Sequence, residues 1–287
     1  MPLTLENEFC KVCVKEEAAE ITSFFDKEKN REVMYQGNEG WSGRNPSLFP
    51  MVGNTYSKNY EIHGKTYAMK NHGLARYATF ASKKEDNKLV FTFVSDKTTR
   101  TQYPFDFVFI ITYSLEGKTL HIDYTIQNTS NEEMPYSFGL HPAFNVAYKE
   151  GETFEDYTIQ FEKKETASQL IFDTNFEKPI EYQPITLDTW PLSREDLTKY
   201  STLIYKDYTS TYVTLCSRFE EILRVHFKDY PYLALWSHPT PSNFICIEPW
   251  YGHADFEKET PDFYHREGTM ILKPGEHQEF SYQIELR

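Results

Sequence analysis

Alternation of apolar and polar residues is the feature of this sequence that most limits its fold. Between Thr119 and Asn128, apolar side chains take every second position from Leu120 to Ile126, and polar side chains take the positions between them. Successive side chains of a β-strand point to opposite faces, so this pattern predicts a strand with one buried face. Such strands are typical of antiparallel sheets.

Similar short segments, separated mostly by turn-like residues, recur along the chain. We predict further strands at residues 89–94, 107–115, 212–217, 222–227, 232–236, 244–247 and 280–286. Helical periodicity is scarce, and one short helix is predicted after Pro191, where Ser193 and Asp196 have the spacing of a capping box. Many strands and very little helix predict an all-β fold, a large antiparallel sandwich or barrel. The 21 Tyr and 22 Phe agree, because aromatic rings favour half-buried pleated surfaces.

Length and charge narrow the functional classes. No stretch rich in Pro, Gly or Ser divides the 287 residues, so we expect one domain over residues 1–287. The net charge of −13 argues against nucleic acid or an anionic membrane as a partner, although a small anionic ligand stays open.

The N-terminal residues lack the basic start and apolar run of a secretory signal. The longest purely apolar run, Phe107 to Ile111, is too short to span a bilayer. We expect a soluble, cytoplasmic protein.

The four cysteines fit a reducing compartment better than a disulfide framework. Cys10 and Cys13 have the spacing of redox or zinc motifs, but Phe9, Val12 and Val14 indicate a strand around them. We therefore expect small, buried apolar side chains at these two positions.

Two histidines and one carboxylate are the candidate catalytic groups. Glu248 interrupts the apolar run 244–247, where an unpaired charge would be costly to bury, so it needs a partner or a task. His72 and His141 lie in glycine-containing turns, and imidazole and carboxylate together can move protons near neutral pH. His141 precedes a proline, so a turn residue that bonds only to the backbone is the alternative.

Other chemistries lack their motifs. His-Glu-x-x-His and His-x-His are absent, so no metal is expected, although a site built from distant histidines stays open. The glycine-rich phosphate loops and Gly-x-Ser-x-Gly are also absent. A glycosidase needs two carboxylates, and no second one stands out beside Glu248.

At these residues the chain resembles the aldose 1-epimerase (galactose mutarotase) family, in particular its LacX-like branch. The resemblance rests on the order and spacing of five segments: Arg44-Asn45-Pro46-Ser47-Leu48-Phe49-Pro50, His72-Gly73-Leu74-Ala75-Arg76, His141-Pro142-Ala143-Phe144-Asn145, Cys246-Ile247-Glu248-Pro249-Trp250 and Leu272-Lys273-Pro274-Gly275-Glu276. It implies a galactose mutarotase-like antiparallel β supersandwich with a sugar groove across one face.

The resemblance also implies roles. Glu248 matches the base that takes the proton of the anomeric hydroxyl, His141 the acid that protonates the ring oxygen, and His72 a second histidine near that oxygen. No cofactor is implied. The scheme requires an ionised Glu248 and a charged His141, and we expect the neighbouring carboxylate to raise the imidazole pKa. A further carboxylate, such as Asp207 or Asp123, stays open as a participant.

The departures from the family pattern concern specificity. Val52-Gly53-Asn54-Thr55 stands where galactose-specific members carry an arginine, and their aspartate before a strand like 222–225 has no clear equivalent. Arg44 and Arg76 resemble basic residues that the hexose-6-phosphate branch uses near its phosphate, which a guanidinium holds well. Surface ion pairs are the alternative for both arginines.

Three aromatic residues, Trp236, Trp250 and Tyr251, are candidate stacking platforms for a sugar, with core packing as the alternative. The predicted function is interconversion of the α and β anomers of a free aldohexose. A hexose-6-phosphate mutarotase and a non-catalytic sugar-binding or sensing protein stay open. The expected partner is a small-molecule sugar, and the protein is expected to be a monomer or homodimer.

Overall fold

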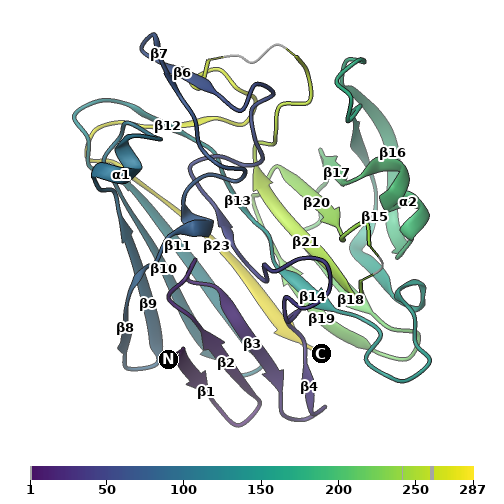
Figure 1. The fold of residues 1–287 in the computed structure, drawn as a ribbon. Helices are drawn as coiled ribbons and strands as arrows, with labels where there is room; N and C mark the ends of the chain where they lie inside the picture. The colour runs from purple at the N-terminus through teal and green to yellow at the C-terminus, as the bar shows by residue number, and fades with distance from the viewer. Residues whose placement is uncertain (1, 241, 259–261) are drawn as a thin grey trace.

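The computed structural model describes residues 2–240, 242–258 and 262–287, and antiparallel strands dominate it (Figure 1). Strands account for 49% of the chain and helices for 6%, which confirms the predicted all-β class. Within the described ranges, no helix has the length and apolar character needed to cross a membrane.

One large sheet carries most of the strands. They follow the order β5-β13-β21-β20-β17-β15-β18-β19-β23-β11-β10-β9-β8, and β14 and β16 add to β21 and β15. Their bounds are β5 (Ser47–Leu48), β8 (Ala81–Glu85), β9 (Lys88–Val94), β10 (Phe107–Glu116), β11 (Thr119–Asn128), β13 (Phe138–Leu140), β14 (Ala143–Asn145), β15 (Thr158–Ile171), β16 (Glu181–Pro191), β17 (Leu203–Lys206), β18 (Tyr212–Cys216), β19 (Glu221–His226), β20 (Tyr232–Trp236), β21 (Phe244–Tyr251) and β23 (His277–Leu286).

Three small sheets complete the fold. Strands β1 (Leu3–Glu6), β2 (Cys10–Val14), β3 (Ile21–Asp26) and β4 (Arg31–Glu32) form a layer that packs on β9 and β10, and Figure 1 shows it in front of them in purple. Strand β6 (Tyr60–Ile62) pairs with β7 (Lys65–Tyr67), and β12 (Met134–Tyr136) pairs with β22 (Met270–Leu272). The helices are α1 (Lys97–Arg100), α2 (Arg194–Tyr200) and the 3₁₀ turns η1 (Ala75–Tyr77) and η2 (Phe154–Asp156).

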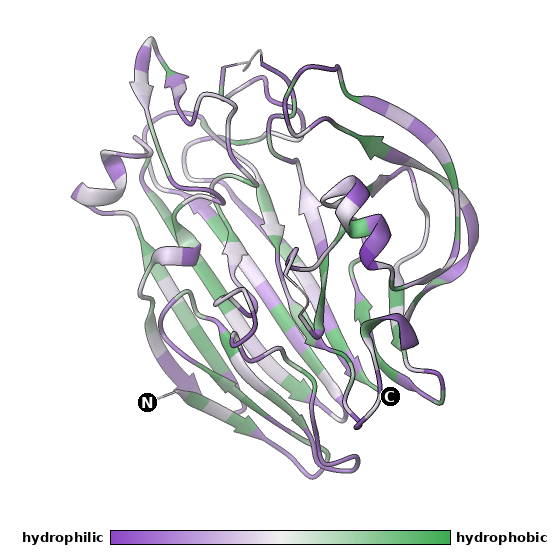
Figure 2. Cartoon of the chain, turned by 45° about the vertical axis from the view of Figure 1, so that its right-hand side comes forward, coloured by the Kyte–Doolittle hydropathy of each residue, from purple (hydrophilic) through white to green (hydrophobic). Residues whose placement is uncertain are grey.

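Local rules predicted many of these elements. Strand β11 has its predicted bounds, and Leu120, Ile122 and Ile126 on its apolar face are fully buried. Figure 2 shows the resulting alternation of hydrophobic and hydrophilic residues along the strands. Ser193 caps α2 by accepting a hydrogen bond from the Asp196 backbone N–H, as the capping spacing predicted.

The predicted strand around Cys10 and Cys13 is confirmed as β2. Cys10 is buried, whereas Cys13, on the opposite face, is partly exposed, so the expectation of two buried side chains holds only for Cys10. Within the described residues all four cysteines are free.

Strand β21 is buried on both faces. Ile245 and Ile247 join the main hydrophobic core, while Cys246 and Trp250 point to the other face, where two smaller apolar clusters lie. The strand runs to Tyr251, beyond the predicted end at residue 247. Alternation is lost where both faces are buried, so the pattern could not show how far the strand extends.

Candidate active site

A cleft of about 400 Å³ lies over the second face of β21, the face opposite the main core. Its lining combines imidazole, carboxylate, guanidinium and indole groups: Gly40, Trp41, Asn71, His72, Arg76, Tyr77, His141, Thr202, Trp236, His238, Glu248 and Trp250. Residues from five separate parts of the chain therefore meet in one cleft, and they include all three predicted catalytic groups.

Glu248 is positioned by an interior strand of the large sheet. It lies on β21 opposite Ala234 of β20, and alternation along the strand places Cys246, Glu248 and Trp250 on the same face. The carboxyl group is almost fully buried, with 1% of the residue exposed. Strand β21 is paired on both sides, with β20 on one and with β13 and β14 on the other, and it places this carboxylate in the lining of the cleft.

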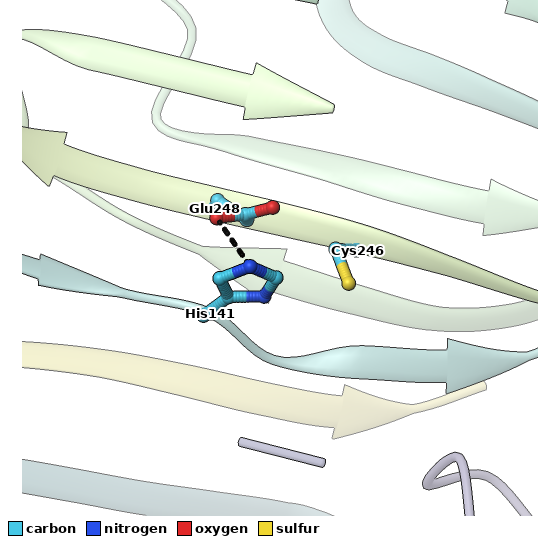
Figure 3. Close-up of side chains that lie close together, drawn as sticks. All are labelled: His141, Cys246 and Glu248. Carbon is cyan, nitrogen blue, oxygen red and sulfur yellow. Dashed lines mark ion pairs between the residues drawn. The ribbon is translucent and has the colours of Figure 1, made fainter. Parts of the chain in front are cut away.

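His141 lies between β13 and β14, two strands that both pair with β21. The backbone N–H of Ile247 donates to the Pro142 carbonyl (3.1 Å), which ties the His141 turn to the strand of Glu248. His141 Nε2 lies 3.4 Å from Glu248 Oε2, as Figure 3 shows. The predicted pairing of these two residues is thus present, and a role in the turn alone does not account for it.

His72 completes the group, and its tautomer can be read from its contacts. The Gly53 backbone N–H donates to His72 Nδ1 (3.0 Å), so this nitrogen is an acceptor and the neutral ring carries its proton on Nε2. The His72 ring stands perpendicular to that of His141 with 5.6 Å between centroids. Burial, followed by the charge of Arg76, lowers the pKa of His72 to about 3, so the ring is neutral.

Aromatic rings hold His141 in place. Trp41 stacks on the imidazole with centroids 4.6 Å apart, and Trp236 meets it edge-on at 5.4 Å. Sequence reasoning identified Trp236 but missed Trp41. A tryptophan between Gly40 and Gly43 in a polar segment, just before the Arg44 motif, was the available signal.

Burial dominates the electrostatics of the catalytic pair. It raises the pKa of the Glu248 carboxyl well above its ordinary value, against the opposing effects of Trp250 and Arg76. It lowers the pKa of His141 well below its ordinary value, and His72 and Arg76 act in the same direction. The expectation that the carboxylate raises the imidazole pKa is therefore wrong, because burial outweighs the attraction between the partners.

The other predicted residues divide into two groups. Arg76, Trp236 and Trp250 line the cleft. Arg44 does not, because its guanidinium donates to the Gln36 carbonyl. Tyr251 also lies elsewhere and donates its hydroxyl to the Asp229 carbonyl (2.8 Å). The further carboxylates considered, Asp123 and Asp207, do not line the cleft either.

Three potential metal ligands come together around His141 and Glu248, two of the residues that line the cleft. The ligand atoms of His141, Cys246 and Glu248 all lie within 4.8 Å of one another, and all three residues are buried (Figure 3). The motif search missed this set because its histidine lies far along the chain from the other two residues.

Comparison with known proteins agrees with this geometry. The family described as aldose 1-epimerase matches residues 1–285, and the chain belongs to that family. Protein LacX of Lactococcus lactis subsp. lactis is 31% identical over 265 residues, which cover 88% of each chain.

Two solved structures are similar over the full chain. A galactose mutarotase related enzyme from Lactobacillus acidophilus has 30% identity and a TM-score of 0.92, with 100% of this chain and 97% of that chain covered. A galactose mutarotase-like protein from Lactobacillus casei has 28% identity and a TM-score of 0.88, with both chains fully covered. The predicted galactose mutarotase-like supersandwich is confirmed.

Proposed function

We propose that this protein is an aldose 1-epimerase that interconverts the α and β anomers of a free aldohexose. The observation that carries the proposal is the contact between His141 Nε2 and Glu248 Oε2, 3.4 Å apart at the floor of an open cleft. An acid and a base at this separation can act on two adjacent oxygens of one sugar ring. Membership of the aldose 1-epimerase family supports the same reaction.

The proposed reaction has two half-steps. Glu248 takes the proton of the anomeric hydroxyl while His141 protonates the ring oxygen, which breaks the carbon–oxygen bond of the hemiacetal and leaves a free aldehyde. Rotation about the bond between the first two carbons exposes the other carbonyl face. The two residues then exchange roles as the ring closes. His72, with its proton on Nε2, supplies a neutral hydrogen-bond donor beside the pair.

Proton counting reconciles this scheme with the pKa directions. A carboxylic acid beside a neutral imidazole holds the same number of protons as a carboxylate beside an imidazolium, so one mobile proton serves both states. Burial favours the neutral pair. We propose that hydroxyl groups of the bound sugar hydrogen-bond to the ions and thereby favour the charge-separated form that starts the reaction.

A phosphorylated sugar is the second candidate substrate, and Arg76 is the observation in its favour. Its guanidinium lines the cleft and forms no ion pair with a carboxylate among the described residues. Arg44 does not support this candidate, because it lies outside the cleft lining. With one arginine available instead of two, we favour the free sugar.

A sugar-binding protein without turnover is the remaining alternative. It would need the cleft and the stacking surface of Trp236 and Trp250, but it would not need an acid and a base in contact.

The test follows optical rotation after pure α-anomers of glucose, galactose and glucose 6-phosphate are dissolved with the protein. We expect acceleration above spontaneous mutarotation, and a loss of at least about 100-fold in Glu248→Gln. Arg76→Gln should selectively impair the phosphorylated sugar if that sugar is the substrate. Equal turnover in Glu248→Gln would contradict the assigned base. Binding without any acceleration would support the sugar-binding alternative.

A further inference from the structure

Cys246 lies beside the acid and base but has no part in the proposed ring opening. It precedes Glu248 by two positions on β21, so both side chains point to the same face of the strand. Its backbone pairs with Ala143, two residues after His141. All three side chains are therefore held by hydrogen-bonded strands and a tight turn, and Figure 3 shows them converging.

Their separations are close to those of a metal centre. Zinc bound at about 2.0–2.3 Å in tetrahedral geometry requires ligand atoms about 3.3–3.8 Å apart. His141 Nε2 and Glu248 Oε2, at 3.4 Å, already have this separation. One ligand atom from each residue of the set lies within 4.8 Å of the other two, which is about 1 Å beyond the upper end of this range.

The site also contains buried polar atoms that lack a hydrogen-bond partner. Glu248 Oε2 and His141 Nδ1 are buried polar atoms without a hydrogen-bond partner in the described structure. Glu248 is 1% exposed and His141 6% exposed. Buried polar atoms normally find partners, so their presence beside a buried sulfur is an observation independent of the distances.

We propose that His141, Cys246 and Glu248 form an inhibitory binding site for a thiophilic divalent cation, with Zn²⁺ as the ligand. The set joins a thiolate, an imidazole and a carboxylate, which suits Zn²⁺ and excludes the hard, oxygen-seeking Mg²⁺ and Ca²⁺. On binding, the thiol proton and any proton of the carboxyl group leave to solvent. No electrons are transferred.

The cation reaches the site through the cleft, which His141 and Glu248 line, while Cys246 is buried beside them. Once bound, it occupies the lone pairs with which those two residues exchange protons with a sugar. The inference of inhibition rests on the proposed epimerase function, whereas the binding site itself does not. We therefore expect Zn²⁺ to inhibit in competition with the sugar.

Binding is tested directly on the full chain, without an activity assay. All measurements use a background protein that carries Cys13→Ser and Cys216→Ser, which remove the two partly exposed thiols. The test substitutions are introduced into this background protein. Cd²⁺ serves as a spectroscopic probe through its thiolate absorption, and Zn²⁺ is titrated by calorimetry. We expect one cation per chain with a thiolate band. The band should vanish and Zn²⁺ affinity should fall at least about tenfold in Cys246→Ala.

Cys10→Ala is the matched control, because Cys10 is equally buried but lies in β2. It should bind like the background. Cys246→Ser provides a second test that keeps the side-chain volume, and it should also weaken Zn²⁺. Absence of a thiolate band in the background protein, or unchanged Zn²⁺ affinity in Cys246→Ser, overturns the site.

Inhibition is tested separately by polarimetry with and without Zn²⁺. We expect inhibition that excess sugar and a chelator both reverse. The Zn²⁺ concentration needed for half-inhibition should be at least about tenfold higher for Cys246→Ser. Equal inhibition of the background and Cys246→Ser proteins overturns the regulatory role. If the protein accelerates no mutarotation, the proposed function fails while the binding experiment still decides the metal site.

Discussion

Replacing Glu248 with glutamine should change the pH dependence of stability as well as abolish activity. Glu248 is 1% exposed, and burial raises its pKa well above the ordinary value of 4.5. The folded protein therefore holds this proton more tightly than the unfolded chain does. As pH rises from 4.5 towards the folded pKa, the unfolded state loses the proton first and the free energy of unfolding falls.

The size of this effect follows from proton linkage. One proton of difference between the two states changes the free energy of unfolding by about 1.4 kcal/mol per pH unit. Between pH 5 and pH 7 the wild-type protein therefore loses up to about 3 kcal/mol through Glu248. Glutamine has no proton to lose. The stability of Glu248→Gln relative to wild type should thus increase by up to this amount over the same interval.

Urea unfolding of both proteins at pH 5, 6 and 7 measures the difference between their free energies of unfolding, in which ionisable groups distant from Glu248 cancel. Glu279→Gln is the control for the general effect of replacing a carboxyl group by an amide, because Glu279 is exposed on β23. A constant difference for Glu248→Gln, or one larger at pH 5 than at pH 7, would refute the conclusion that the fold holds Glu248 in its protonated form.

Three further predictions concern the catalytic pair and its supports. Burial lowers the pKa of His141 below 6.5 and raises that of Glu248 above 4.5, so the pair keeps one mobile proton across neutral pH. The rate of mutarotation plotted against pH should therefore be a broad bell whose acid limb lies well below pH 6.5. Polarimetry measures this profile, and an acid limb above pH 6.5 or a flat profile would count against the neutral pair. Trp41→Ala removes the ring stacked on His141, a contact worth about 0.5–1.5 kcal/mol, so kcat should fall several-fold while Trp41→Phe keeps most activity. Unchanged saturation kinetics in Trp41→Ala would show that the stacking does not position His141. Gly53→Ala should destabilise the fold by more than about 1 kcal/mol, because φ is +69° and the new Cβ would lie 2.4 Å from Ala254 Cβ. Gly64→Ala, at φ +71° with open space around it, is the matched control in urea unfolding, and an equal loss in both would show that the contact with Ala254 contributes nothing.

Local patterns predicted the β class because alternation depends only on neighbouring residues. Strand β11 has one buried face, and its sequence shows its full length. The β15–β16 hairpin was missed because it is largely exposed and its polar residues do not alternate regularly with apolar ones. The end of β21 was missed for the opposite reason, because both of its faces are buried.

The sequence by itself determined the residue types of the site. Glu248 stood out as an acid inside an apolar strand, and that anomaly is a local property. Only the tertiary structure decided which groups meet. It placed His72 beside His141, brought in Trp41, left Arg44 outside the cleft, and set Cys246 against the acid and base. It also reversed the expected pKa shift of His141. The physical reason is that strand pairing between distant segments sets separations and burial, and these cannot be read from neighbouring residues.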